Sequence, residues 1–331
     1  MRLALKEDLL RLLEENRGKT LSGEEMAKRL YVSRNAVWKA VCALRREGVQ
    51  IDAAPRRGYR LVESANFFSA LSVSSKLNEP LCGRLSILVK ESTGSTNSDL
   101  KALAENGAAH GQILIAKEQT AGKGRLGRSF CSPKDTGLYM SILLRPNFSA
   151  EEALFITTSA AVAVSEAIDR FSNAESRIKW VNDVYLSGKK VCGILTEASM
   201  DFESGGLNYA VCGIGVNLSA ERLPKELENI AGGIMNERNE ENDFRAPLAA
   251  EILSRFFVYY DRLPALDFLS EYRRRSLLIG REIVFLKNGR EYSGTAVGLD
   301  DRVRLVVKLS SGELTALSSG EAVLKKGDLI K

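Results

Sequence analysis

The sequence predicts an α+β protein built from several domains. The chain of 331 residues exceeds a typical single domain, so two or three domains are expected. Apolar residues recur at helical spacing near the amino terminus, strand-like and helical runs mix in the middle, and short strand-like runs separated by turn residues follow near the carboxyl terminus. These changes of pattern predict domains at residues 1–63, 64–274 and 275–331.

The composition is that of an ordinary globular protein, with 44% hydrophobic and 27% charged residues. No apolar run approaches the roughly 18 residues that a membrane helix needs, and the charged start of the chain lacks the apolar core of a signal peptide. Because no such apolar segment is present, no membrane contact is expected. Because the five cysteines are scattered without CxxC spacing, we expect reduced thiols in a cytoplasmic protein. His110 is the single histidine, so a Cys/His metal site is not expected.

Charge is distributed unevenly along the chain. Residues 1–64 hold 14 Lys and Arg against 9 Asp and Glu, whereas the remainder holds 33 of each, so the net charge of +5 resides in the first fifth. A basic module attached to a neutral body favours an anionic partner for that module.

Two short helices joined by a tight turn are predicted in this basic module, after a first helix at residues 5–16. Ser22 and Glu25 form a capping-box pattern at the start of the second helix, and Ser33 can cap a third helix at residues 34–46. These proportions are those of a helix-turn-helix, whose second helix meets base edges and phosphates. The residues expected at that interface are Ser33, Arg34, Asn35, Trp38 and Lys39.

A β-hairpin is predicted next, with strands at residues 49–51 and 58–61. It would form a wing that brings Arg56 and Arg57 toward a phosphate backbone, giving a winged helix-turn-helix that binds DNA. The alternative is a helical module with a solvated charged face.

The central domain begins with strands at residues 85–90 and 112–116 and a helix at residues 99–105. Ser95, Thr96 and Asn97 precede the helix, where they can cap it or direct hydroxyl and amide groups into a pocket.

The most informative segment is the glycine-rich loop at residues 119–128. Gly122, Gly124 and Gly127 satisfy GxGxxG and nearly satisfy a P-loop, but both motifs require a helix immediately afterwards, and proline and glycine follow instead. What remains is a loop whose backbone amides and cations can close over a small anionic ligand. A mobile basic surface loop is the alternative. Its cations are Lys123, Arg125 and Arg128.

Further along, we expect a buried strand at residues 138–144 and a helix capped by Ser149 that ends near residue 171. A strand at residues 178–186, a turn into a strand at 191–197, and a strand at 209–217 complete the domain. Polar residues within these apolar strands are costly to bury unless they pair or serve a ligand. An aspartate there could hold magnesium and lysines could neutralise phosphate, or the group could be a structural ion pair. The polar residues of the first strand are Lys179, Asn182 and Asp183, while Lys190 lies in the following turn and Asn217 at the tip of the last strand.

Four short strands near residues 281–286, 291–297, 304–309 and 313–317 are separated by Asn-Gly, Asp-Asp and Ser-Gly turns. This spacing predicts a small barrel of about 50 residues.

Six motifs in order give the chain a resemblance to bacterial bifunctional biotin–protein ligases that are also biotin-operon repressors, over essentially its whole length. They are the winged-helix start, Ser95-Thr-Asn97, the loop from Ala121 to Arg128, Lys179-Trp-Val-Asn-Asp183, Lys190-Val-Cys-Gly-Ile194 and Gly213-Ile-Gly-Val-Asn217. The resemblance implies a class II synthetase-like α/β central domain and an SH3-like carboxy-terminal barrel.

The resemblance also implies roles for site residues. Arg125, Lys190 and Asp183 would be catalytic, with Asp183 as the magnesium ligand. Biotin would be bound by Ser95, Thr96, Asn97, Gln119, Lys123, Gly124, Arg125, Lys190 and Gly193. ATP and the adenylate would be bound by Gly122, Arg128, Lys179, Asn182 and Asn217. Two departures stand out, because the family usually has arginine at Lys123 and proline at Val181.

The implied activity uses ATP and Mg²⁺ to convert biotin into biotinyl-5′-adenylate and then transfers biotin to a lysine of a biotin carboxyl carrier protein. That carrier would belong to acetyl-CoA carboxylase or another biotin-dependent carboxylase. The adenylate-bound form would dimerise and bind operator DNA as a repressor. The alternatives are a lipoate–protein ligase, which the winged helix and barrel argue against, and a ligand-sensing transcription factor without ligase turnover, which Arg125, Asp183 and Lys190 argue against.

Overall fold

The structure is a computed structural model of the 331-residue chain. It describes residues 2–46, 49–54, 57–62, 68–149, 152–200, 206–235, 244–287, 290–318 and 322–324. The chain divides into two compact units, Met1–Val89 with Arg238–Ala250, and Lys90–Glu237 with Glu251–Lys331. Among the described residues, none of the helices combines the length and apolar character needed to cross a membrane.

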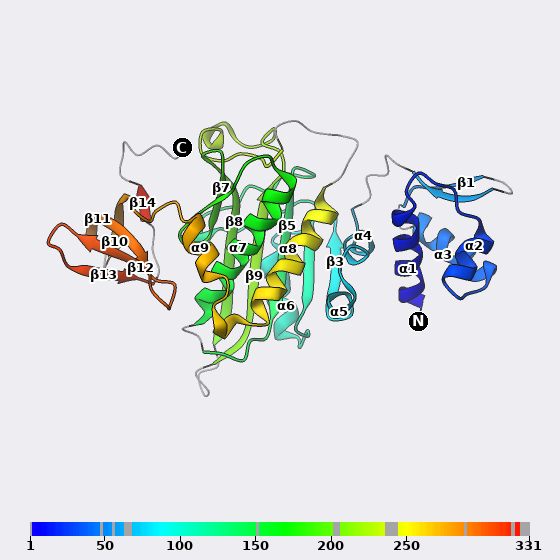
Figure 1. The fold of residues 1–331 in the computed structure, drawn as a ribbon, viewed down its shortest axis with the longest axis horizontal. Coiled ribbons are helices and arrows are strands. Elements are labelled where there is room, and N and C mark those ends of the chain that lie inside the picture. The colour runs from blue at the N-terminus through cyan, green and yellow to red at the C-terminus, as the bar shows by residue number, and fades with distance from the viewer. Residues whose placement is uncertain are drawn as a thin grey trace. The chain divides into compact units, whose positions relative to one another are not determined.

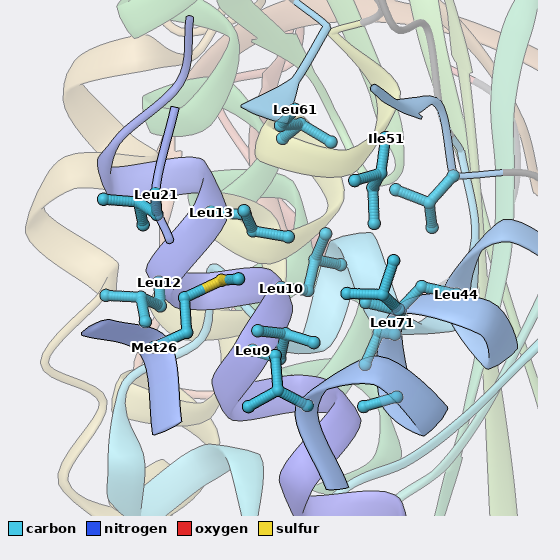
Figure 2. Packing of buried hydrophobic residues seen from close by; sticks show 14 of the residues in the cluster. Leu9, Leu10, Leu12, Leu13, Leu21, Met26, Leu44, Ile51, Leu61 and Leu71 are labelled. Atoms are coloured by element: carbon cyan, nitrogen blue, oxygen red, sulfur yellow. The ribbon is translucent and has the colours of Figure 1, made fainter. Parts of the chain in front are cut away.

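The first unit begins with three helices, α1 (Arg2–Glu15), α2 (Gly23–Arg29) and α3 (Arg34–Arg46) (Figure 1). Both predicted caps are present, because Ser22 Oγ accepts from Glu25 N at 3.0 Å and Ser33 Oγ accepts from Ala36 N at 3.2 Å. Glu25 does not complete a described capping box; its carboxylate accepts from Arg29 at 2.6 Å. Leucines of α1 meet residues of α2, α3 and the following strands in one apolar core (Figure 2).

A short antiparallel hairpin follows, formed by β1 (Ile51–Ala54) and β2 (Gly58–Leu61). The first strand starts at residue 51, because Val49 N instead donates to Leu44 O at the end of α3. Arg56 lies outside the described residues, and Arg57 is exposed. The unit continues with α4 (Ala70–Ser74), α5 (Glu79–Cys82) and β3 (Ser86–Lys90).

The second unit contains an antiparallel sheet in which six strands follow the order β4-β5-β9-β8-β7-β6. Helix α6 (Thr96–Glu105) packs on β4, β5 and β9, whereas α7 (Ala153–Phe171) packs on β8 and on α9 (Leu269–Arg275). Helix α8 (Arg245–Tyr260) spans the boundary between the units. The strands are β4 (Gln112–Ala116), β5 (Gly137–Leu144), β6 (Arg177–Lys179), β7 (Asp183–Leu186), β8 (Lys189–Met200) and β9 (Leu207–Asn217).

Two sequence predictions in this unit were wrong. Residues 178–186 were predicted as one strand but form a hairpin of β6 and β7, with Lys179 opposite Asp183. The backbone of the intervening turn bonds to other parts of the chain. Val181 O accepts from Tyr272 Oη at 3.0 Å, and Asn182 O accepts from Ile194 N at 2.9 Å. Ser149 does not cap α7, since its backbone N–H and hydroxyl donate to Glu152 at 2.8 and 2.9 Å and the helix begins later, at Ala153.

The carboxyl end forms a separate antiparallel sheet of order β13-β12-β11-β10-β14. The four predicted strands are present, and a fifth, β14, was missed because it is only three residues long. The bounds are β10 (Glu282–Lys287), β11 (Arg290–Leu299), β12 (Leu305–Leu309), β13 (Leu314–Leu317) and β14 (Ala322–Leu324).

Candidate active site and nucleic-acid interface

A cavity of about 350 Å³ lies in the second unit and gathers residues that are far apart in the sequence. All nine residues predicted for biotin line it, as do Arg128, Lys179, Asn182 and Asp183 from the predicted nucleotide and catalytic sets. Two predicted residues are not part of the lining. Gly122 packs closely against the backbone of Phe130, so that a Cβ added to it would be 2.3 Å from Phe130 O. Asn217 is buried at the end of β9, and its carbonyl accepts a hydrogen bond from Ile234 N.

The amino-terminal end of α6 forms one wall of the cavity. Ser95 caps this helix, and Thr96 N donates to Gln119 Oε1 at 2.9 Å, with Thr96 Oγ1 at 3.1 Å from the same oxygen. Gln119 Nε2 donates in turn to Ser132 Oγ at 2.9 Å. The helix start is therefore tied to the glycine-rich loop by the amide of one glutamine.

A second polar group lies behind this wall. Ser141 on β5 is fully buried, and its Oγ lies 2.7 Å from both Thr96 Oγ1 and Asn97 Oδ1. Asn97 Nδ2 donates to Leu195 O at 3.1 Å and to Glu197 Oε2 at 2.9 Å, while Lys101 Nζ pairs with Glu197 Oε1 at 2.9 Å. Burial raises the pKa of the Glu197 carboxyl, but the hydrogen bonds from Lys101 and Asn97 outweigh burial and lower its pKa overall.

The glycine-rich loop turns back on itself beside the cavity. Gly124 N donates to Arg128 O at 2.7 Å and Phe130 N donates to Gly122 O at 2.9 Å, with a 3₁₀ turn at Arg125–Gly127 between them. No α-helix follows the loop, as the failed nucleotide motifs predicted. Leu126 is 71% exposed at the tip, and Arg125 Nη1 donates to Asn182 Oδ1 at 3.0 Å, which links the loop to the β6–β7 turn.

Sequence reasoning missed Phe130, Ser141 and Glu197. The ring of Phe130 lines the cavity and lies against β8 and β9, where a Cβ on Gly193 or Gly215 would be 3.2 or 2.5 Å from it. The alternating glycines of β9 were a signal for close approach by another group, but they could not identify that group. Ser141 and Glu197 lie within runs that look like ordinary strands.

The cavity favours an anionic ligand. Among the described residues that line it, Asp183 is the only acid, against five cations. Lys190 Nζ lies 2.7 Å from Asp183 Oδ1, which is buried. Nearby, burial raises the pKa of Tyr272 well above its ordinary value, with Asp183 adding to the effect, so this phenol stays neutral and donates to Val181 O. The cations are Lys123, Arg125, Arg128, Lys179 and Lys190.

Of the lining residues that the structure describes, Asp183 is the carboxylate that a magnesium ion could use. Within the described ranges, His, Cys, Asp and Glu side chains form no group of three that could hold a metal by themselves. Mg²⁺ is typically held by one or two carboxylates together with substrate phosphates. Asp183 therefore fits an ion that arrives with a nucleotide and does not fit a permanent metal centre.

The first unit presents a different surface. Ser33, Arg34, Asn35, Trp38 and Lys39 are all exposed at the start of α3, with Trp38 54% exposed. A hollow of about 620 Å³ is lined by Arg34, Asn35 and Trp38 and by Arg57, which immediately precedes β2; Lys39 is not part of its lining. Exposed cations and an exposed aromatic on the second helix of a helix-turn-helix are the groups that contact nucleic acid.

Three family models match the chain. The biotin/lipoate A/B protein ligase family matches residues 89–217, an HTH domain matches residues 6–60, and the biotin protein ligase C terminal domain matches residues 278–325. The amino-terminal helix-turn-helix and a central ligase domain were therefore correct predictions.

Individual proteins match over most of their length. The bifunctional ligase/repressor BirA of Bacillus spizizenii is 32% identical over 317 residues, covering 94% of this chain and 96% of the relative. The biotin–[acetyl-CoA-carboxylase] ligase of Mycobacterium tuberculosis is 32% identical, covering 70% and 86%. The structure of the Aquifex aeolicus biotin protein ligase in complex with biotin and ATP matches with a TM-score of 0.61 and 27% identity, covering 72% of this chain and 98% of that one. This chain therefore belongs to the biotin protein ligase family, among its bifunctional ligase/repressor members.

Proposed function

We propose that this chain is an ATP-dependent biotin–protein ligase that also represses transcription in response to biotin. The observation that carries the ligase half is a cavity in which, among the described residues, five cations and a hydrogen-bonding helix start converge around Asp183. The solved relative that holds biotin and ATP supports the same ligands here.

In the first step, a carboxylate oxygen of biotin attacks the α-phosphorus of ATP. A P–O bond forms, the bond to the β-phosphate oxygen breaks, and pyrophosphate leaves. Charge grows on the phosphoryl oxygens, so positioned cations lower the barrier. Lys190, oriented by Asp183 at 2.7 Å, and Arg125, oriented by Asn182 at 3.0 Å, supply this charge. Lys179 and Arg128 add charge for the outer phosphates.

Magnesium, when bound through Asp183 and the nucleotide, would neutralise phosphate charge.

In the second step, the amine of an acceptor lysine attacks the carbonyl carbon of the mixed anhydride. An amide bond forms, AMP leaves, and the nitrogen loses a proton. Until the acceptor arrives, the anhydride must be kept from water. The loop at residues 122–128, tethered by Arg125 to Asn182, performs this task. The acceptor is a biotin carboxyl carrier protein, because the M. tuberculosis relative is named for acetyl-CoA carboxylase.

We further infer that the first unit is a winged helix-turn-helix that binds operator DNA when the adenylate-bound chain forms a homodimer in the cytoplasm. The hairpin of β1 and β2 and the exposed cations of α3 support this assignment. We propose the domain division 1–63, 64–274 and 275–331, with the carboxy-terminal sheet as an SH3-like barrel.

The ligase proposal is tested by incubating the full chain with ATP and either biotin or lipoate, and by detecting the acyl-adenylate and labelled carrier domain by mass spectrometry. Biotinyl-adenylate and biotinylated carrier are expected. Adenylate from lipoate alone would identify a lipoate ligase, and adenylate from neither acid would indicate a binding protein without turnover.

A further inference from the structure

The turn between β11 and β12 is shaped by one carboxylate. Asp300 Oδ1 accepts from the backbone N–H groups of Arg302 at 3.0 Å and Arg304 at 2.9 Å, and Asp300 Oδ2 accepts from Arg304 Nε at 2.6 Å. The backbone closes the same turn, because Val303 N donates to Asp300 O at 3.0 Å. Burial raises the pKa of Asp300, but the hydrogen bonds from Arg304 and Arg302 outweigh burial and lower its pKa overall. The carboxylate is therefore charged near neutral pH.

Val303 adopts an unusual backbone conformation within this turn. Its φ is 58°, in the left-handed region that a β-branched residue rarely enters, and its side chain is fully buried. Such a conformation persists only where the surrounding contacts fix it. In this conformation the carbonyl of Val303 accepts a hydrogen bond from Trp180 Nε1 at 3.1 Å.

Trp180 connects this contact to the cavity. The residue directly follows β6, lines the cavity and is 4% exposed. An indole N–H that is buried needs a hydrogen-bond acceptor. Because Val303 O is that acceptor, the carboxy-terminal sheet bonds directly to a residue of the cavity wall.

The β6–β7 turn, which begins at Trp180, orients two cations of the cavity. Asn182 Oδ1 in this turn accepts from Arg125 Nη1 at 3.0 Å. Asp183, where the turn ends, lies 2.7 Å from Lys190 Nζ. The position of this turn therefore affects the placement of both cations.

Helix α9 is bonded to both turns. Tyr272 Oη donates to Val181 O at 3.0 Å in the β6–β7 turn. The next residue of the helix, Arg273, donates through Nη2 to Leu299 O at 2.8 Å, at the end of β11. One helix thus holds the two turns, and the indole contact joins them directly.

We propose that Asp300 is a positioning residue for adenylate formation, because it shapes the turn that presents Val303 O to Trp180 and so holds the β6–β7 turn in place. The carboxy-terminal sheet is then part of the reaction centre and not only a packing module. This inference rests on the proposed ligase function.

The first test measures single-turnover adenylate formation by the full chain with biotin and ATP. Asp300→Ala removes the acceptors that shape the turn, so the maximal rate should fall about threefold to tenfold, the effect of one lost hydrogen bond. The biotin concentration that gives half the maximal rate should change little, because the wall at the start of α6 is untouched. Asp300→Asn keeps an oxygen for the two backbone N–H groups and should restore most of the rate. The matched control is Asp301→Ala, at a side chain that is 98% exposed, and it should behave as wild type.

A double-mutant cycle separates positioning from a general loss of stability. Trp180→Phe keeps a ring in the cavity wall and removes the indole N–H. If Asp300 acts through this contact, Asp300→Ala causes little further loss of rate in the Trp180→Phe background. Losses that multiply would show that the two residues act independently and would overturn the inference.

A spectroscopic measurement reports the contact without turnover. The chain has 2 tryptophans, so the ¹⁵N-labelled chain gives two indole N–H signals, and Trp180→Phe shows which one belongs to Trp180. In Asp300→Ala this signal should move upfield and exchange faster with deuterium oxide, whereas Asp301→Ala should leave it in place. A signal that does not move in Asp300→Ala would contradict the role of Asp300.

Trp180→Phe decides the matter if Asp300→Ala does not fold, because an adenylation rate at the wild-type level in that variant would overturn the inference. A wild-type chain that forms no biotinyl-adenylate would instead overturn the ligase proposal. The indole signals would still show in that case whether the two turns are joined.

Discussion

The cations of the two units are held in opposite ways. In the cavity, Arg125 and Lys190 have oriented partners in Asn182 and Asp183. On the start of α3, the side chains of Arg34 and Lys39 are exposed, and neither side chain forms an ion pair or hydrogen bond with the described residues. Oriented charges suit catalysis, because they need little rearrangement as the transition state forms. Solvated charges suit a phosphate backbone, where binding gains from counterion release.

The largest effect is expected from Lys190→Ala, which removes an oriented cation from the cavity. Adenylate formation should fall by about 100- to 1,000-fold in kcat, by analogy with the loss of a single oriented transition-state donor. Single-turnover assays measure this. Lys189→Ala, at the exposed neighbouring position, is the matched control and should keep near wild-type activity; equal losses in both variants would contradict a specific role for Lys190.

Arg125→Gly should release adenylate prematurely, because it removes the 3.0 Å tether between the loop and Asn182. A lost hydrogen bond to a charged group corresponds to release that is faster by about tenfold or more. Biotinylation of a bystander protein mixed with the enzyme and ATP measures the leak. Leu126→Gly is the control, since this exposed residue has a φ of 55° that glycine adopts readily. A leak of the same size in the control would show that loop flexibility, and not the tether, governs retention.

Removing a solvated charge should have a smaller effect, confined to DNA. In Arg34→Ala, the slope of log affinity against log salt should decrease in magnitude by about 1 for each phosphate that the variant no longer neutralises, with ligase activity unchanged. Fluorescence anisotropy with operator DNA over a salt series measures the slope. Lys76→Ala, in the same unit but 3.8 Å from Glu14, should leave the slope as it is. A changed ligase rate in Arg34→Ala would contradict the separation of the two regions.

The smallest effect concerns stability at low pH. Hydrogen bonding from Arg274, with further help from Arg275, lowers the pKa of Glu271 from 4.5 to about 2. Because the folded-state pKa is depressed, the stabilisation is complete above pH 4.5 and is lost as the pH falls toward 2. Urea denaturation between pH 2 and 4.5 should show that the free energy of unfolding depends less steeply on pH in Glu271→Gln than in the wild-type chain. The same flattening in the exposed control Glu228→Gln would exclude Glu271 as the source.

Much of the fold could be predicted from local sequence patterns, because the caps of helices and the turns between strands are recognisable within a few residues. Ser22 and Ser33 cap their helices as predicted. The β6–β7 hairpin could not be predicted, because the backbone of its turn accepts hydrogen bonds from residues outside the hairpin. Tyr272 is distant in sequence, and Ile194 lies on β8. Local sequence contains no information about such partners.

The cavity was predicted from motifs, and its supporting residues were not. The motif residues Arg125 and Lys190 line the cavity, but Gly122 serves the fold of the loop instead. Glu197 and Ser141 hydrogen-bond to Asn97 from two strands, 100 and 44 residues from it in sequence. These contacts form only when β5, β8 and α6 are brought together.

One titration would test most directly whether the two regions serve one function. Operator DNA binding is followed by anisotropy while adenylate is quantified in the same sample, with biotin and ATP added together or singly. DNA affinity should rise in proportion to adenylate and remain low with either ligand alone. Adenylate formation without any change in DNA affinity would contradict a biotin-responsive repressor.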